Sequence, residues 1–156
     1  MKYRLRITDE ESKKEINVSE DEIIEVKYKI GLAEDTNLAN SRSTVEMEIT
    51  GKIISNLENA GDNLNSENKR VNDDLYERNK KNIIDLVEWA ESYLQKSDYR
   101  NLEMFVDLGS NKKMDLKFTN MFVYNFLQEM SIEKGIGIFK LKLRQKFHQK
   151  NKLDIK

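Results

Sequence analysis

The feature that most constrains this chain is a period-two alternation of apolar and polar residues, which recurs in several segments. Such alternation is typical of half-buried strands, because successive side chains of a strand point to opposite faces of a sheet. The pattern predicts strands at residues 2–7, 24–30, 44–50, 102–106, 114–118, 122–126 and 139–144. The turn signal Gly109-Ser110-Asn111 predicts a hairpin, and Gly135 and Gly137 predict another turn. The sequence therefore predicts a mainly β fold, a barrel or sandwich of about seven antiparallel strands.

One segment follows a different period. Ile83, Leu86, Val87, Ala90 and Leu94 recur at the spacing of an amphipathic helix, with Trp89 and Tyr93 widening the apolar stripe. This helix is expected to begin at Asp73 or Asp74, to end around Lys96, and to pack alongside the sheet. The preceding stretch, residues 55–72, is rich in asparagine, which favours turns, so it is predicted to be a long surface loop.

The chain has 156 residues, a length that suits one ordinary domain. We expect a single β-barrel domain over residues 1–146, and a basic, frayed tail over residues 147–156. The net charge of −1 argues against a dedicated nucleic-acid binder, which needs a surplus of bases. No apolar run has the length of a signal peptide core or a membrane span, so a soluble protein without membrane insertion is expected.

The sequence offers little that resembles catalytic chemistry. It has no cysteine, and its one histidine, His148, lies in the basic tail, where a solvated surface role is the simplest interpretation. The Gly135-Ile136-Gly137 segment lacks the lysine of a phosphate loop. No catalytic, metal-binding or cofactor-binding residue is predicted, and no cofactor is expected. Acidic residues are abundant, however, and a glycosidase needs only two carboxylates in a cleft, so a monomeric binding module or small glycan-active hydrolase stays open as the alternative.

Charge is unevenly distributed along the chain. Between Asp9 and Val26 eight acids stand against two bases, a net of −6, and from Ser131 to Lys156 eight bases stand against two acids, a net of +6. Two solvated surfaces of different sign explain this equally well as two complementary faces that meet between copies of the chain.

Three segments of the C-terminal half, Leu102–Val106, Met114–Phe126 and Glu133–Lys146, carry a resemblance to a known family. They comprise a strand, an aromatic-Val-aromatic segment at Phe122–Tyr124, a charged turn with glycines, and a closing strand that ends Arg-Gln-Lys. In order and spacing they resemble the tube proteins of contractile injection machines, including phage tail tubes and the haemolysin-coregulated tube protein of type VI secretion. The likeness is good over residues 83–146 and rests on pattern alone in the N-terminal third.

The resemblance implies a barrel flanked by a helix, six copies in a ring, and rings stacked into a hollow tube without catalytic residues. It implies as partners other copies of the chain and sheath, baseplate or spike proteins, with synthesis in the cytoplasm and a place in a phage-tail-like particle or secretion apparatus. The stretch at residues 55–72 and the tail after Lys146 depart from a compact tube subunit, which leaves open an initiator or adaptor ring. The residues expected at the subunit interface are Leu32, Asp35, Asn37, Arg42, Lys140, Lys142 and Arg144.

Overall fold

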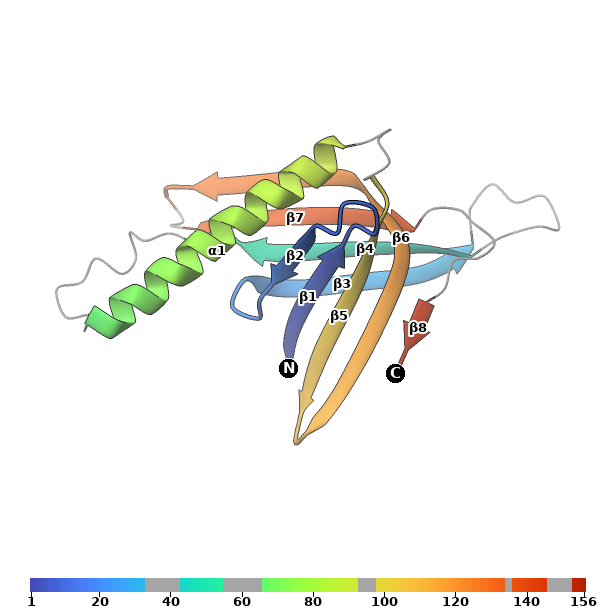
Figure 1. The fold of residues 1–156 in the computed structure, drawn as a ribbon, viewed down its shortest axis with the longest axis horizontal. Coiled ribbons are helices and arrows are strands. Elements are labelled where there is room, and N and C mark those ends of the chain that lie inside the picture. The colour runs from blue at the N-terminus through green and yellow to red at the C-terminus, as the bar shows by residue number, and fades with distance from the viewer. Residues whose placement is uncertain (33–42, 55–65, 93–97, 134–135, 146–152) are drawn as a thin grey trace.

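The computed structural model consists of eight antiparallel strands and one helix, and it describes residues 1–32, 43–54, 66–92, 98–133, 136–145 and 153–156 (Figure 1). The predicted mainly β fold with one helix is confirmed. The elements, in chain order, are β1 (Lys2–Thr8), β2 (Glu15–Val18), β3 (Ile23–Leu32), β4 (Ser43–Lys52), α1 (Ser66–Glu91), β5 (Arg100–Gly109), β6 (Lys112–Ser131), β7 (Ile136–Gln145) and β8 (Leu153–Ile155).

The strands form one sheet in the order β2-β1-β5-β6-β7-β4-β3, with β8 attached to β6 beside that path. The 20-residue strand β6 belongs to two groups of strands, because Lys112–Met121 pair with β5 and Met121–Ser131 pair with β7. The interruption expected at Thr119 and Asn120 is a bend within this one strand, at which Asn120 has a positive φ of 52°. The strands β1 and β5 consequently run across the direction of β3, β4 and β7 (Figure 1).

The hydrophobic core lies between these two groups of strands. The long strands contribute alternate residues to it, as the period-two pattern predicts, and the opposite residues form the outer faces. Tyr28 on β3 lies edge-on to the buried ring of Phe118 on β6, with 5.5 Å between ring centroids, so the core is continuous between the groups. Its largest fully buried side chains are Trp89, Phe118, Phe139, Leu5, Ile7, Ile16, Met47, Ile49, Leu86, Leu102, Leu116 and Met121.

The helix α1 packs against β2 and β6. Trp89 is completely buried, and its indole Nε1 donates a hydrogen bond to the Asp98 carbonyl oxygen at 2.8 Å. Closer to the start of the helix, the side chains of Asn79 and Asn82 both donate hydrogen bonds to the carboxylate of Glu22, which is only 1% exposed. An apolar stripe and a buried polar cluster therefore both hold the helix to the sheet.

The helix boundaries differ from the prediction. The helix begins at Ser66, so residues 66–72 are not part of the predicted loop, and residues 55–65 lie outside the described part of the chain. Asparagine lowers helix propensity only slightly, and tertiary packing of later turns readily overrides that preference. The helix ends at Glu91, before the predicted Lys96, and Leu94 and Tyr93 also lie outside the described residues.

Other differences concern short strands and turns. The strand β2 was not predicted, because four residues with two buried side chains, Ile16 and Val18, give too short an alternation. Residues 153–155 form β8, so this part of the tail is paired and not frayed. The hairpin at Gly109-Ser110-Asn111 is confirmed, with positive φ at all three residues. Gly137, expected in a turn, lies inside β7.

Candidate assembly surfaces

Three of the predicted interface residues, Lys140, Lys142 and Arg144, lie on the outer face of the β3–β4–β7 group. Cross-strand register places Glu46 of β4 between Lys29 of β3 and Arg144 of β7, and the two ion pairs measure 3.3 and 3.2 Å. In the next row Glu48 lies between Lys27 and Lys142, with Lys142 Nζ 3.8 Å from the carboxylate. These rows form ladders of alternating charge across the sheet.

The ladders leave this face basic. Six bases stand against three acids on the outer positions of β3, β4 and β7, a net of +3; the bases are Lys27, Lys29, Lys52, Lys140, Lys142 and Arg144, and the acids are Glu25, Glu46 and Glu48. The paired side chains are 30–74% exposed, so each ion pair adds little to stability. The Arg144 guanidinium also lies 4.2 Å from the ring centroid of Tyr124, an aromatic side chain that is 41% exposed. Neighbouring side chains of the same subunit therefore hold Lys29, Lys142 and Arg144 in position.

The outer face of the β2–β1–β5–β6 group carries similar ladders. Glu103 of β5 lies between Arg6 of β1 and Lys117 of β6, at 4.0 and 3.6 Å. In a second row Asp107 of β5 lies between Lys2 and Lys113. On both outer faces, an acid of the middle strand thus lies between bases of its two neighbouring strands.

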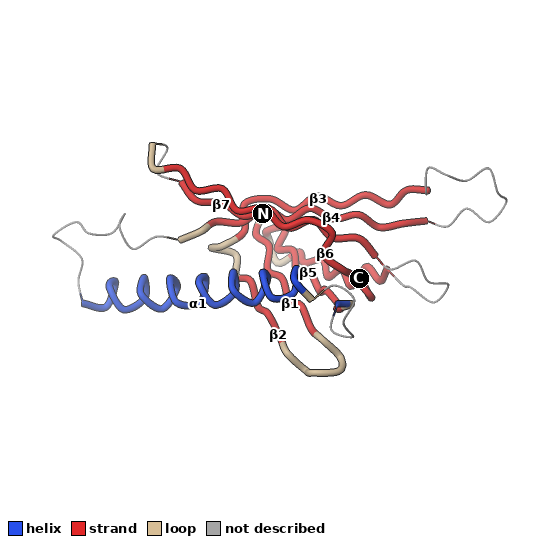
Figure 2. The backbone as a smooth tube through the Cα atoms, turned by 90° about the horizontal axis from the view of Figure 1, so that it is seen from above, coloured by secondary structure: helices blue, strands red, loops and turns tan. Residues whose placement is uncertain are grey.

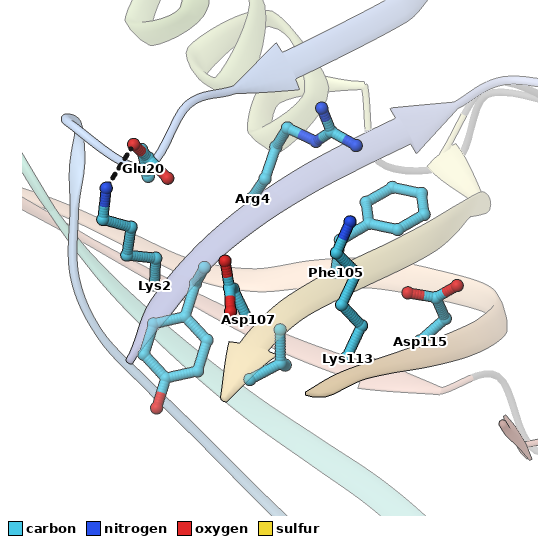
Figure 3. A pocket seen from close by; sticks show the side chains of 9 residues that line it. Lys2, Arg4, Glu20, Phe105, Asp107, Lys113 and Asp115 are labelled. Carbon is cyan, nitrogen blue, oxygen red and sulfur yellow. Dashed lines mark hydrogen bonds and ion pairs between the residues drawn. The ribbon is translucent and has the colours of Figure 1, made fainter. Parts of the chain in front are cut away.

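Between these rows the surface is hollowed into a cleft of about 440 Å³ (Figure 3). The Arg4 guanidinium lies over the Phe105 ring on its floor, 4.9 Å from the centroid, and Lys2 forms a 3.1 Å ion pair with Glu20 at its rim. Three bases and three acids alternate around the cleft: Lys2, Arg4, Lys113, Glu20, Asp107 and Asp115. The carboxylates alternate with bases as in the neighbouring ladders, which does not favour the carboxylate-pair hydrolase over a surface charge ladder.

Large apolar side chains are exposed at the margins of the sheet. At the β6–β7 hairpin, Met130 is 75% exposed, Ile132 is fully exposed and Ile136 is 53% exposed. The hairpin extends to the same side of the molecule as the N-terminal part of α1 (Figure 2). Sequence reasoning missed this cluster, although three apolar residues beside a glycine-containing turn were a usable signal.

The strand β3 is the second apolar margin. Among the described strands it pairs on one side only, with β4, so the other edge of residues 23–30 is open to a further strand. Ile30 and Ile24 on this edge strand are 53% and 49% exposed. A long edge strand without proline, with exposed apolar side chains, is suited to pairing with another chain.

The remaining predicted site residues are distributed as follows. Leu32 is the last residue of β3, at the end of the open edge, whereas Asp35, Asn37, Arg42 and His148 lie outside the described residues. Within the described ranges there is no group of three or more His, Asp or Glu side chains that could hold a metal ion. In the same part of the chain, no helix has the length and apolar character needed to cross a bilayer.

Comparison with known proteins gives matches at the level of structure. No family model matches the sequence, and no curated protein matches it. The structure is similar to a variant of the Hcp1 protein from Escherichia coli EAEC 042, with a TM-score of 0.56 and 9% identity, covering 100% of this chain and 98% of that one. Hcp1 from Flavobacterium johnsoniae aligns with a TM-score of 0.52 and 12% identity, covering 99% and 94% of the two chains.

This chain has the Hcp-like tail-tube fold. A chain of the baseplate of the anti-feeding prophage is also similar, with a TM-score of 0.50 and 4% identity, covering 99% of this chain and 92% of that one. The alignments run over the full length of the sheet and include the N-terminal third, where the sequence likeness rested on pattern alone. At identities of 4–12%, what is shared with these proteins is the fold.

Proposed function

We propose that this chain is a structural, non-enzymatic subunit that assembles with copies of itself into a ring, six-membered by analogy, within a phage-tail-like or contractile injection assembly. The proposal is carried by one observation: an Hcp-like fold over the whole chain in which the long edge strand β3 has a described strand on one side only. Sheath, baseplate or spike proteins of the same assembly are its proposed further partners.

The open edge of β3 supports self-assembly for a physical reason. No described strand of the subunit lies on the far side of residues 23–30, and a strand from a second copy would pair with their backbone while covering Ile24 and Ile30. When the surface that receives β3 is a different one on the partner, the contact is heterologous, and such contacts close into rings or grow as filaments. This geometry suits a ring subunit.

The charge asymmetry of the sequence gives weaker support than its net values suggest. Within the acidic segment, Glu22 is buried against α1, Glu15 pairs with Arg6 at 3.1 Å, and Glu20 pairs with Lys2. Two of these acids are thus paired with bases within the subunit, and a third is buried. We propose that Lys140, Lys142 and Arg144 act at the interface by steering and orienting copies, since exposed charges change association more than stability.

The test is light scattering on a size-exclusion column across a concentration series, with negative-stain images of the largest species. We expect rings or stacked rings for the unmodified chain. Ile30→Lys, which places a charge on the open edge, is expected to give monomers. Ile84→Lys on α1 is the matched control, because Ile84 is similarly exposed, at 49%, and it should assemble as the unmodified chain does. A strict monomer at every concentration would overturn the proposal.

A further inference from the structure

The C-terminal strand β8 pairs with the rest of the sheet through a short backbone ladder. It spans three residues, Leu153–Ile155, and its backbone pairs with Leu116–Phe118 of β6. Just beyond it, Lys156 and Asp115 exchange two backbone hydrogen bonds, at 3.0 and 2.9 Å. Strands of this length are at the lower limit of what sheets contain.

The edge that β8 covers is available only because β6 bends. On one side, the first half of β6 is paired with β5 throughout. On the other side, β7 pairs with β6 only from Met121 onward, so β8 is the one described strand that contacts the edge of residues 115–118. Without β8 this stretch would be a further open edge, separate from those of the terminal strands β2 and β3.

The one described apolar side chain of β8, Ile155, is also incompletely buried. Ile155 is 48% exposed, although it is paired directly with Leu116, which is buried. A cavity of about 210 Å³ adjoins the strand, lined by Phe105, Asp115 and Lys156 among others. The Ile155 side chain is therefore only partly covered, and the described attachment of this strand to β6 is a short backbone ladder.

We infer that β8 is an exchangeable strand, which in the assembly leaves its own β6 and pairs with the β6 edge of a neighbouring copy. A backbone ladder recognises an edge and not a particular chain, so the neighbour offers the same partner in the same register. Exchange of an identical element is a low-cost route to association, because the neighbour's β6 supplies the same backbone pairing that the strand gives up on its own. This inference rests on the proposed self-assembly, which supplies a neighbour at high local concentration.

The length of chain before β8 allows such an exchange. Seven residues, 146–152, separate Gln145 at the end of β7 from Leu153. A connection of this length reaches up to roughly 25 Å when extended. That distance is comparable to the width of a small subunit, so a neighbour in contact with β7 lies within reach.

The chain contains no cysteine, so introduced thiols report on this pairing alone. Asp115 and Lys156 are a directly opposed, hydrogen-bonded pair, whose Cα atoms are expected about 5.5 Å apart, within the range that a disulfide spans. One full-length variant carries Asp115→Cys and a second carries Lys156→Cys, with a size tag on one of them. They are mixed as monomers, assembled, oxidised mildly and separated without reductant.

Exchange predicts that the assembled mixture forms cross-linked heterodimers in at least tenfold greater amount than the cross-linked homodimers that either variant forms alone. A matched control uses Lys2→Cys mixed with Asp107→Cys, an opposed pair on β1 and β5, two strands joined by a seven-residue ladder that should not exchange. This control mixture should show no cross-link above background. The double variant with both Asp115→Cys and Lys156→Cys, oxidised as a monomer, should form its disulfide within one chain.

The outcomes separate the two proposals. Rings that form without cross-linked heterodimers overturn the exchange of β8 and leave the assembly proposal standing. Failure of the unmodified chain to assemble overturns the assembly proposal, and the exchange of β8 with it. Heterodimers that appear equally in the control mixture also overturn the exchange, because the cross-link then reports collision and not pairing.

Discussion

Replacing Glu22 with glutamine tests whether the buried polar cluster under α1 determines how the helix is held. The Glu22 carboxylate accepts hydrogen bonds from the Asn79 and Asn82 side chains, at 3.0–3.2 Å, and from the backbone and hydroxyl of Ser19, at 2.8 and 3.0 Å. All of these partners act as donors. A carboxylate meets them with two acceptor oxygens, whereas an amide turns one acceptor into a donor.

The magnitude follows from counting the bonds that an amide cannot make. If the new NH₂ replaces Oε1, the bonds that this oxygen accepts from Asn79 and Asn82 are lost; if it replaces Oε2, the two bonds from Ser19 and a second bond from Asn82 are lost. At least two bonds to a charged group, at about 1.5–3 kcal/mol each, are therefore removed in either orientation. Removing a buried charge offsets part of this loss. We expect the free energy of unfolding to fall by about 2–4 kcal/mol.

The assay is urea unfolding followed by the fluorescence of Trp89, the single tryptophan, which is completely buried in the folded chain. For a chain of this size the slope is about 2 kcal/mol per molar urea, so the midpoint should fall by roughly 1–2 M. Protein concentration is kept where the chain is monomeric, since association adds to apparent stability.

Glu20→Gln provides the control for this prediction. Glu20 is an exposed acid two residues away, paired with Lys2 at 3.1 Å, and its loss should cost less than about 0.5 kcal/mol. If Glu22→Gln changes stability no more than Glu20→Gln does, the reasoning about the buried acceptor is wrong. The helix would then be held by its apolar stripe alone.

Two further substitutions test other buried features by the same assay. Burial raises the pKa of Asp98, an effect that Arg100 opposes, and one carboxylate oxygen of Asp98 has no hydrogen-bond partner. Because the folded pKa lies above the unfolded one, ionisation lowers stability as pH rises through the folded pKa. Asp98→Asn should therefore stabilise the chain by about 1 kcal/mol at pH 7 and by nothing below about pH 3.9, and a loss of stability at pH 7 would contradict this. At Gly51 an added Cβ would overlap the Phe139 ring and lie 2.9 Å from the Glu22 carbonyl oxygen. Gly51→Ala should therefore lower the free energy of unfolding by about 1–3 kcal/mol, and Gly51→Ala/Phe139→Leu should recover part of that loss. An unchanged urea midpoint in Gly51→Ala would contradict this prediction.

The strands were predictable because each long one buries one face. Residues such as Val45, Met47 and Ile49 alternate without interruption, and a strand of that kind is visible in sequence alone. Strands β2 and β8 were not predictable from alternation. The first has only two buried residues, and the second spans only three residues, so neither gives a run of alternation.

The start of α1 was missed for a related reason. Its amphipathic stripe becomes clear only in the later turns, while the first turns carry the asparagines that were interpreted as a loop. Asn79 and Asn82 within the helix are polar residues that face inward because they donate hydrogen bonds to the buried Glu22 carboxylate. That partner lies 57 and 60 positions away, and no local pattern indicates such a contact.

The candidate interface shows the same limit. The basic residues Lys142 and Arg144 were identified correctly as one outward face of β7, but their partners on β4 depend on a pairing of strands nearly a hundred positions apart. The open edge of β3 and the exposed hairpin at Met130 follow from sheet order, which alternation does not determine.

These observations together indicate where contacts between copies should form. On both outer faces most charges lie in ladders that are paired within the subunit, which leaves a partner only the surplus of bases on the β3–β4–β7 face to balance. Several exposed apolar side chains lie instead at the margins, on β3, at the end of the β6–β7 hairpin and on β8 along the edge of β6. Contacts made edge to edge bury this apolar surface and pair these backbone groups, whereas contacts made face to face would only displace existing ion pairs. Assembly should accordingly depend on edge substitutions at any salt concentration, and on face charges chiefly at low salt, where exposed charges are least screened.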